Sequence, residues 1–260
     1  MPKFTLADFR KDLSPKYKLV PKLDKAIASF DDEWTFHYEP KVHDLFWHPS
    51  GHCVPEPSVL YDLATDRLNA WPSLPDPEHE RSMRKFGPVG HFWHQFLQHI
   101  MVRYEMVPPE AIERQGAKWW GEAAVVGGEV DMRWHPPKPF HACIGNADVA
   151  PWTYKGRDYI VDFKTMGSRN FQAVTLPPAF AAKYECQMNI YMDMFEYDAA
   201  LIVAINKDTP HDFKEFEFRR NQPLIDMIYS KWKYVAECLE DHDRPDADDD
   251  VDFPLPLEWA

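Results

Sequence analysis

The sequence predicts an α/β (α+β) fold, in which helices flank a central mixed β-sheet and an N-terminal helical and irregular extension packs on this core. Two observations predict it. Hydrophobic residues make up 45% of the 260 residues and aromatic residues 15%, which is enough for a sizeable core. Strand-like segments are grouped in the middle of the chain, and segments with the apolar spacing of helices precede, separate and follow them.

Residues 1–85 are expected to form the N-terminal extension. Leu23 to Phe30 is a candidate short helix, and Ser58–Leu68 is a second one. Pro72 to Pro77 then marks a loop, because clustered prolines interrupt helices and strands alike.

The core is expected from residue 86 to residue 240. Its first element is a helix over Gly90 to Val102, where apolar residues recur at helical spacing. Three candidate strands follow, and the turn at Gly156 and Arg157 predicts that the last two form an antiparallel hairpin. These candidates are Ala123–Met132, Ala142–Ala150 and Asp158–Thr165.

The core continues with a long helix over Pro178 to Phe195. Strands are predicted at Ala200–Asn206 and Phe213–Phe218, and an amphipathic helix from about Pro223 to Leu239 completes the core. Residues 241–260 are expected to form an acidic, mobile C-terminal tail.

The net charge of −13 is distributed unevenly along the chain. Residues 240–260 contain nine acids and one base, so this segment carries −8 of the −13, whereas residues 1–25 contain seven bases and three acids, or +4. Phosphate binding depends on the local field rather than on the net charge. The acidic total therefore does not exclude a nucleic-acid partner.

No run of about 18 apolar residues predicts a membrane span, and no signal peptide is apparent, so we expect a cytoplasmic protein without a membrane partner. The four cysteines, Cys53, Cys143, Cys186 and Cys238, lie far apart and form no C-x-x-C pair. This spacing argues against a zinc ribbon and against a disulfide framework, and most of the four are expected to be buried thiols.

Two aspartates carry the chemistry that the sequence predicts. Asp148 and Asp162 each lie among apolar residues in a strand-like segment. On a strand Asp162 and Lys164 face the same side, whereas Phe163 points into the opposite layer. Paired carboxylates suit Mg²⁺ or Mn²⁺, and a neighbouring lysine can orient a nucleophile or stabilise a transition state. An ordinary ion pair on a solvated strand face is the alternative interpretation.

An isolated acid in one strand followed by D/E-x-K in the next strand resembles the PD-(D/E)XK nuclease superfamily. Within it, the sequence is similar to the RecB-like exonuclease branch, which includes the CRISPR-associated exonucleases and many phage enzymes. The resemblance covers roughly residues 85–240. It implies a restriction-endonuclease-like core, DNA as the substrate and Mg²⁺ or Mn²⁺ as the cofactor.

Two helical motifs add to the resemblance. That branch has a G-x-x-x-H helix upstream, which Gly90 and His94 match, although His91 fits the same spacing from an earlier glycine. His94 is preferred. Downstream, Gln187 and Tyr191 match the branch's Q-x-x-x-Y motif on the helix after the D-x-K strand. Tyr184 shares their helix face, because side chains three and four positions apart are neighbours.

The resemblance implies a role for each of these residues. Asp148, Asp162, His94 and the carbonyl of Phe163 would hold the metal, and Lys164 would act on the attacking water beside the two catalytic aspartates. Gln187, Tyr191 and Thr165, the threonine that often follows the lysine, would position the substrate. Glu129 is a weaker candidate ligand, and Glu122 a weaker one still.

The sequence departs from the CRISPR-associated members in its cysteines. Those members often bind an iron–sulfur cluster through cysteines after the last helix, where this chain has only Cys238, so we expect no cluster. His43, His48, His52 and Cys53 form a local group that could bind zinc, and a Trp- and His-rich loop over the core explains the group equally well.

The acidic tail, with Phe and Pro at its tip, resembles the tails by which single-strand-binding proteins recruit partners. It could dock on a replication or recombination protein, cover the enzyme's own basic groove, or be simply solvated. The leading function is a metal-dependent DNA exonuclease of phage or bacterial recombination, replication or repair. The alternatives are an endonuclease with the same core and an inactive DNA-binding or assembly module.

Overall fold

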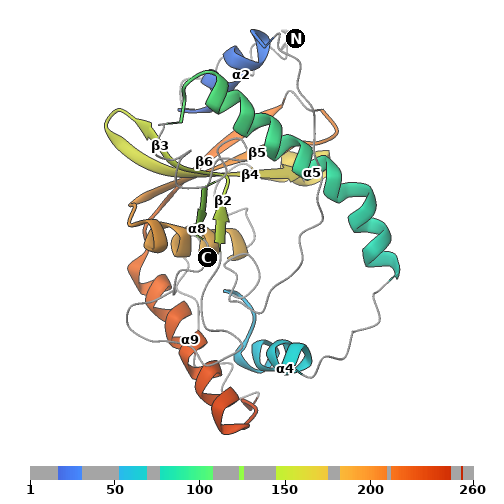
Figure 1. Cartoon of the computed structure of the whole chain (residues 1–260), viewed down its shortest axis with the longest axis vertical. Coiled ribbons are helices and arrows are strands. Elements are labelled where there is room, and N and C mark those ends of the chain that lie inside the picture. The colour runs from blue at the N-terminus through green and yellow to red at the C-terminus, as the bar shows by residue number, and fades with distance from the viewer. Residues whose placement is uncertain are drawn as a thin grey trace, which may run out of the picture.

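The computed structural model describes residues 17–30, 53–68, 77–107, 123–125, 145–174, 182–209, 212–246 and 253. Helices and strands follow one another in groups along the chain, as shown in Figure 1. The elements are α2 (Val20–Ala28), α4 (Pro57–Leu68), α5 (Pro77–Arg103), β1 (Ala123–Val125), β2 (Gly145–Ala147), β3 (Val149–Tyr154), β4 (Arg157–Met166), α7 (Ser168–Ala173), α8 (Ala182–Phe195), β5 (Ala199–Asn206), β6 (Phe213–Arg219) and α9 (Gln222–Asp241).

The central sheet has the strand order β3-β4-β5-β6 and is mixed. Strands β3 and β4 are antiparallel, β4 and β5 are parallel, and β5 and β6 are antiparallel. Strands β1 and β2 pair separately in a two-stranded antiparallel sheet. The parallel pair needs a crossover connection, which α7 and α8 supply. A mixed sheet flanked by helices, as the sequence predicted, is confirmed.

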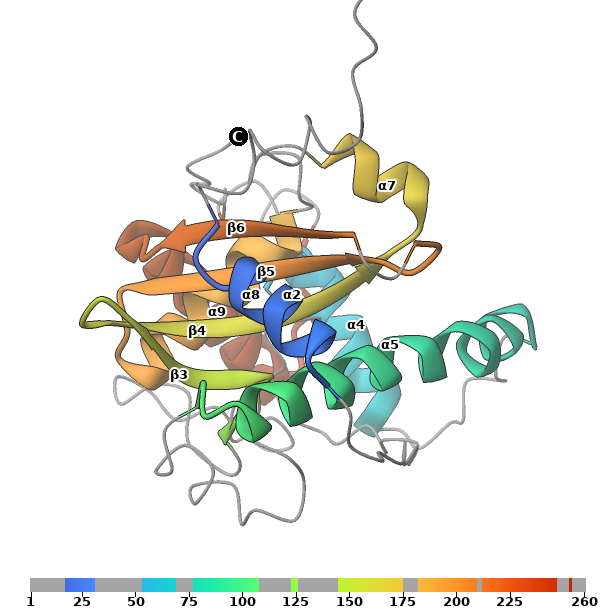
Figure 2. The ribbon, with the colours of Figure 1, turned by 90° about the horizontal axis from the view of Figure 1, so that it is seen from above.

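Helices cover both faces of the central sheet. In Figures 1 and 2, α2 and α5 lie over one face, while α8 lies on the other with α9 beyond it. Every residue of β5 is buried, since this inner strand has neighbours on both sides and helices on both faces.

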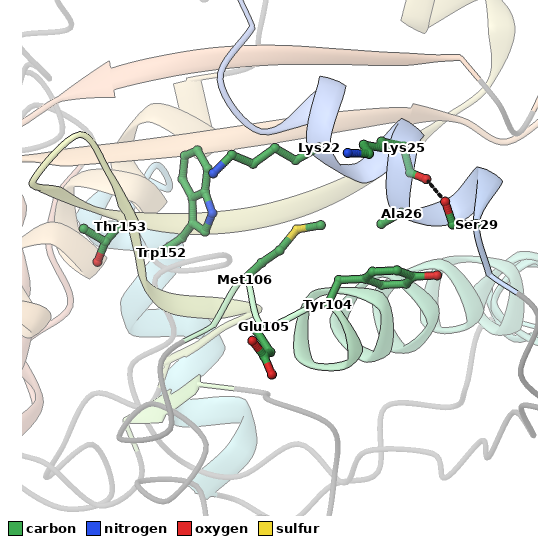
Figure 3. Close-up of a pocket in the computed structure, with 9 residues that line it drawn as sticks. All are labelled: Lys22, Lys25, Ala26, Ser29, Tyr104, Glu105, Met106, Trp152 and Thr153. Carbon is green, nitrogen blue, oxygen red and sulfur yellow. Dashed lines mark hydrogen bonds between the residues drawn. The ribbon is translucent and has the colours of Figure 1, made fainter.

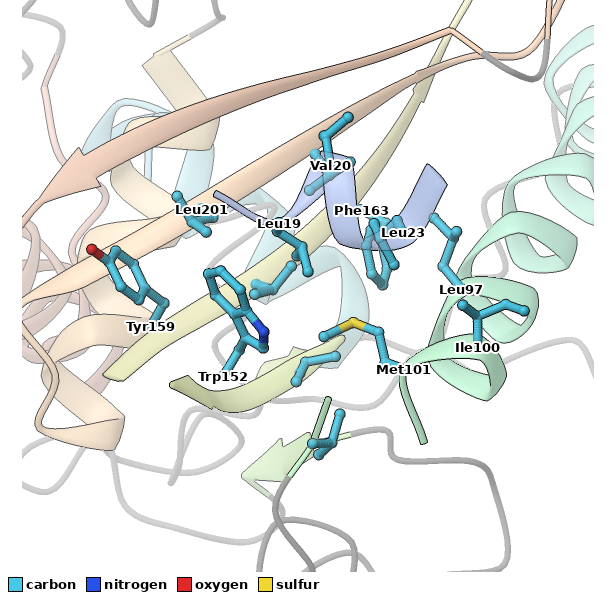
Figure 4. Close-up of a cluster of buried hydrophobic side chains, with 14 of the residues drawn as sticks. Leu19, Val20, Leu23, Leu97, Ile100, Met101, Trp152, Tyr159, Phe163 and Leu201 are labelled. Carbon is cyan, nitrogen blue, oxygen red and sulfur yellow. The ribbon is translucent and has the colours of Figure 1, made fainter. Parts of the chain in front are cut away.

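The face under α2 and α5 carries the first hydrophobic cluster, which Figure 4 shows. Phe163 of β4 projects into it, against leucines of α2 and α5, as the alternation of side chains along a strand predicted. Ile160 projects to the opposite face, into the cluster beneath α8. A third cluster joins α4, α8 and α9.

The β3–β4 hairpin closes through Lys155 and Gly156, whose φ angles are 51° and 76°. Two successive residues in the left-handed region suit a tight hairpin turn, and glycine adopts that region without strain. Arg157, which the sequence placed in the turn, is instead the first residue of β4.

Glu215 of β6, almost 200 residues later in the sequence, binds the backbone at the start of α2. The backbone N–H groups of Lys18, Leu19 and Val20 all donate to the Glu215 carboxylate, with Leu19 N at 2.6 Å and Val20 N at 3.1 Å from Oε2. Glu215 is buried. The first N–H groups of a helix have no partner within the helix, so a carboxylate placed there stabilises it.

A buried lysine fixes the segment before α4 in a similar way. Lys231 of α9 is 1% exposed, and its ammonium donates to the carbonyls of Cys53, Val54 and Pro55 at 2.6, 3.3 and 2.9 Å. Three carbonyls match the three hydrogen-bond donors of an ammonium group. This arrangement connects the segment before α4 to α9.

Several element boundaries differ from the sequence-based prediction. The helix predicted at Gly90–Val102 begins at Pro77, because proline is tolerated in the first turn of a helix. It therefore runs across residues 85 and 86, where the extension was expected to end and the core to begin. The division into extension, core and tail remains a prediction. Helix α7 was not predicted. Of Ala123–Met132 the structure describes only β1, so the rest of that prediction lies outside the described residues.

Cys53 and Cys186 are buried thiols, Cys238 is half-buried, and Cys143 lies outside the described residues, as do His43, His48 and His52 of the proposed zinc group. No helix within the described ranges has the length and apolar character needed to cross a membrane.

Candidate active site

Asp148 lies in a bend between β2 and β3, where one continuous strand over Ala142–Ala150 was predicted. The pairing of β3 with β4 begins at the next residue, Val149. Just before this pairing begins, the Asp148 side chain takes the place of a strand partner, because its Oδ2 accepts a 2.6 Å hydrogen bond from the backbone N–H of Phe163. The bend thus brings the Asp148 carboxylate to the stretch of β4 that carries Asp162 and Lys164.

Helix α5 holds Asp148 by two contacts. His94 Nδ1 lies 2.8 Å from Asp148 Oδ1, and Gln98 Nε2 donates to the Asp148 carbonyl at 2.9 Å. The two side chains are four residues apart, so they project from the same face of the helix. Gln98 is buried, whereas the His94 side chain retains 29% exposure. Both the side chain and the backbone of Asp148 are therefore fixed.

Asp162 and Lys164 form a buried ion pair on β4. Lys164 Nζ lies 2.6 Å from Asp162 Oδ2, and the two side chains are 18% and 3% exposed. The ammonium also lies 5.4 Å from the centroid of the Tyr184 ring of α8. Asp162 Oδ2 has no hydrogen-bond partner of normal geometry among the described residues. The contact is thus mainly one of charge, and the buried oxygen retains capacity for a further ligand.

The contact between His94 and Asp148 shifts the pKa values of both groups. Burial by itself would lower the pKa of His94, but the neighbouring Asp148 charge and hydrogen bond outweigh it and raise the pKa. Burial would raise the pKa of Asp148, but His94 and the Phe163 N–H outweigh it and lower the pKa. Each charge is stabilised by the other, as expected for opposite charges a few ångströms apart.

The pKa of Asp162 moves in the opposite direction from that of Asp148. Burial raises the pKa of Asp162, and the negative charge of Asp148 adds to this effect against the opposing effect of Lys164. Burial would lower the pKa of Lys164, but Asp162 and Asp148 outweigh it and raise the pKa, which keeps the ammonium protonated. Two carboxylates whose pKa values are displaced in opposite directions are typical of sites that handle protons and charge.

The other residues singled out in the sequence lie on α8 and on β4. Gln187 and Tyr191 are buried on α8, and Gln187 Nε2 donates to the Tyr191 hydroxyl at 3.0 Å. Thr165 lies on the other face of β4 from Asp162 and Lys164, since side chains alternate along a strand. A Cβ atom on Gly90 of α5 would lie 3.4 Å from Thr165 Oγ1, so the glycine permits a close approach of the helix to β4.

The donor chemistry fits a divalent metal ion. Asp148 and Asp162 offer the hard oxygen ligands that Mg²⁺ and Mn²⁺ prefer, and the buried Asp162 Oδ2 retains coordination capacity. Within the described residues no group of three or more His, Cys, Asp or Glu side chains converges as a metal site. The donors are instead held as two pairs, His94 with Asp148 and Asp162 with Lys164. An ion would replace one or both of these contacts.

The structure also identifies a site residue that sequence reasoning missed. Gln98 contacts Asp148 directly, and its spacing from His94 on a predicted helix was the available signal. Among the predicted histidines, His94 is the one whose contact with Asp148 defines this site. Glu129 and Glu122 lie outside the described residues.

The sequence matches no protein-family profile and no curated protein. Solved structures that are similar to this chain include SSO0001 and two exonucleases. SSO0001 has a TM-score of 0.43 and 16% identity over 88% of this chain and 85% of that one. The phage-related exonuclease from Haemophilus somnus 129PT has a TM-score of 0.39 and 12% identity over 77% and 96%. The alkaline exonuclease LHK-Exo from Laribacter hongkongensis has a TM-score of 0.34 and 15% identity over 52% and 65%.

Proposed function

We propose that this chain is a metal-dependent deoxyribonuclease, and specifically a DNA exonuclease acting in recombination, replication or repair. One observation carries the proposal. Two buried carboxylates with oppositely displaced pKa values, Asp148 and Asp162, lie with a protonated lysine and an imidazole at one place on the sheet. Buried charges are costly to maintain, and this arrangement suits the hydrolysis of a phosphodiester.

The metal ligands in this proposal are Asp148, Asp162, His94 and the carbonyl of Phe163. In an extended strand the N–H and C=O of one residue point to the same side. The Phe163 carbonyl is therefore directed to the side from which Asp148 contacts the Phe163 N–H. When bound, a divalent ion lowers the pKa of a water ligand and neutralises charge that develops on the phosphate.

Lys164 acts as a positioned cation. Because Asp162 and Asp148 raise the pKa of its ammonium, Lys164 donates hydrogen bonds and does not accept a proton. It orients the attacking water and stabilises charge on the phosphate oxygens. Tyr184 of α8 lies beside this ammonium. Gln187 and Tyr191, on the same helix, position the substrate.

Cleavage of linear and circular DNA, with Mg²⁺ or Mn²⁺ added, tests the proposal. Asp162→Asn and Lys164→Ala are compared with Asp158→Asn, which makes the same chemical change as Asp162→Asn at the exposed end of β4. We expect degradation of linear DNA alone, a loss of about 10²–10³ in rate for the two site variants and no loss for Asp158→Asn.

The other outcomes are equally informative. Nicking of circular DNA would assign an endonuclease with the same core. Binding of DNA without cleavage under either metal would contradict the enzyme and leave an inactive DNA-binding module. A rate in Asp162→Asn equal to that in Asp158→Asn would remove Asp162 from the chemistry.

A further inference from the structure

A pocket lined by charged and polar side chains lies at the C-terminal end of helix α5. Its volume is about 370 Å³, and it opens between α2, the end of α5 and β3. Its walls carry Lys22, Lys25 and Ser29 of the α2 region, Tyr104 and Glu105 just after α5, and Thr153 of β3. Figure 3 shows Lys22 reaching toward Trp152, with Tyr104 on the opposite wall.

The charge and hydrogen-bonding groups of this pocket suit phosphate oxygens. Lys22 and Lys25 are exposed and three residues apart, so both ammonium groups occupy one face of α2. Glu105 is the one acid among the lining residues, and the Tyr104 hydroxyl adds a neutral donor, whereas the Ser29 hydroxyl donates to the Lys25 carbonyl at 2.9 Å. Lysine and hydroxyl side chains are typical contacts to the backbone of nucleic acids.

Aromatic rings hold the lysine in place. Lys22 Nζ lies 5.3 Å from the centroid of the Trp152 ring and 5.4 Å from that of Tyr154, which stack on each other at 5.6 Å. On the hairpin turn, Lys155 Nζ lies 5.3 Å from the same Tyr154 ring. Rings that order a lysine reduce the conformational entropy lost when its ammonium binds a ligand.

The pocket and the candidate active site lie at the two ends of the edge strand β3. Asp148 directly precedes β3, and Thr153 is five residues later, a separation of about 17 Å at about 3.3 Å per residue. Along α5, His94 and Tyr104 are ten residues apart, or about 15 Å at about 1.5 Å per residue. Along the axis of a DNA duplex, which rises about 3.4 Å per base pair, this separation spans only a few base pairs, so one bound duplex can extend over both places.

We infer that the pocket between α2, α5 and β3 binds the phosphodiester backbone of DNA a few base pairs along the duplex from the bond that is cut. This inference rests on the proposed function for its distance to the cut, but the binding itself does not require cleavage. The pocket supplies sequence-independent affinity, because Lys22 and Lys25 meet phosphates rather than base edges.

An acidic peptide is the rival occupant, and the chain's own acidic tail is the nearest source. Phe253 of that tail stacks on Tyr234 of α9, with ring centroids 5.3 Å apart. Helix α9 packs with α4 and α8, whereas the pocket lies beside α2 and α5 on the other face of the sheet. The described contact of the tail thus favours DNA as the occupant.

Binding of a labelled DNA duplex to the full chain in chelator, measured by fluorescence anisotropy over a range of salt concentrations, tests the inference. The variant Lys22→Gln/Lys25→Gln removes both charges, Lys22→Arg/Lys25→Arg keeps them, and Lys233→Gln removes an equally positive lysine that is 58% exposed on α9. Two lost phosphate contacts reduce the slope of log K against log salt by about 1.8, at about 0.9 per contact. The arginine variant and Lys233→Gln should keep the wild-type slope.

A wild-type slope in Lys22→Gln/Lys25→Gln would overturn the inference even if the enzyme cuts DNA. Conversely, a reduced slope in a protein that never cuts DNA would sustain the pocket and contradict the proposed function. With metal added, the double glutamine variant should raise KM on long DNA and leave kcat unchanged. A peptide of residues 246–260 that displaces DNA from wild type but not from Lys233→Gln would place the DNA contact on α9 and overturn the inference.

Discussion

The contact between Glu215 and the start of α2 predicts that Glu215→Gln lowers the stability of the protein substantially. Glu215→Gln keeps the size of the side chain, but removes its charge and turns an amide donor toward a backbone donor. At present three N–H groups share the carboxylate, at 2.6 to 3.1 Å. Hydrogen bonds to a charged group contribute about 1.5–3 kcal/mol, and a partly buried charge at a helix terminus contributes up to about 2 kcal/mol.

Because the amide oxygen still accepts from some of the donors, we expect Glu215→Gln to reduce the free energy of unfolding by about 2 kcal/mol. That loss corresponds to a fall in Tm of about 4–8 °C for a chain of this size. Urea unfolding and thermal melting give the global value, and hydrogen exchange at the amides of α2 reports whether the helix is the part that loosens.

Glu217→Gln is the matched control. It makes the same change two residues along β6, where Glu217 forms partly exposed ion pairs with Lys18 and with Arg219. Such surface pairs contribute about 0–1 kcal/mol. Equal losses in the two variants, or wild-type exchange in α2 of Glu215→Gln, would refute the reasoning.

Three further predictions concern buried groups. Because the pKa of His94 is raised in the folded state, its contribution to the free energy of unfolding is complete below about pH 6.5 and is lost as pH rises through the folded pKa. Because the pKa of Asp148 is lowered, its contribution is complete above about pH 3.9 and is lost as pH falls through the folded pKa. The stability difference between wild type and His94→Gln should therefore be largest between about pH 4 and 6.5, and urea midpoints that differ equally at pH 5 and pH 9 would contradict the pair. Lys231→Met leaves three carbonyls without their donor and should cost about 3 kcal/mol in urea unfolding, against less than about 0.5 kcal/mol for the exposed Lys233→Met. Burial raises the pKa of Cys186 to about 12, so this thiol should resist iodoacetamide at pH 8 until urea unfolds the chain, and rapid labelling of the native protein would show that it is accessible.

The order of elements and the D-x-K strand could be predicted from the sequence because they depend on local patterns. The strand around Asp162 has apolar neighbours on both sides and alternating faces, which leave a clear signal. The helix carrying Gln187 and Tyr191 was predicted for the same reason. The grouping of Gln187 and Tyr191 with Lys164 follows from the resemblance and stays a prediction.

The features that sequence reasoning missed depend on contacts between distant residues. At the bend, the Asp148 carboxylate accepts a hydrogen bond from the Phe163 N–H, fifteen residues away, and such a long-range contact leaves no local pattern in the sequence. Helix α5 continues through Pro88 although proline and glycine usually interrupt a helix, so its true start could not be read from those residues. Gln98 resembles any polar helical residue until Asp148 is placed beside it.

The packing of α4 against α9 has a consequence for how the protein is made. Lys231 holds carbonyls that precede it by 176 to 178 residues, and Arg244 pairs with Asp62 through two 2.8 Å hydrogen bonds across 182 residues. A twelve-residue helix is marginal on its own in water. During synthesis, α4 therefore leaves the ribosome long before its partner exists, and it can settle only when nearly the whole chain has emerged. A chain stopped before α9 would expose the apolar face of α4 to chaperones and proteases.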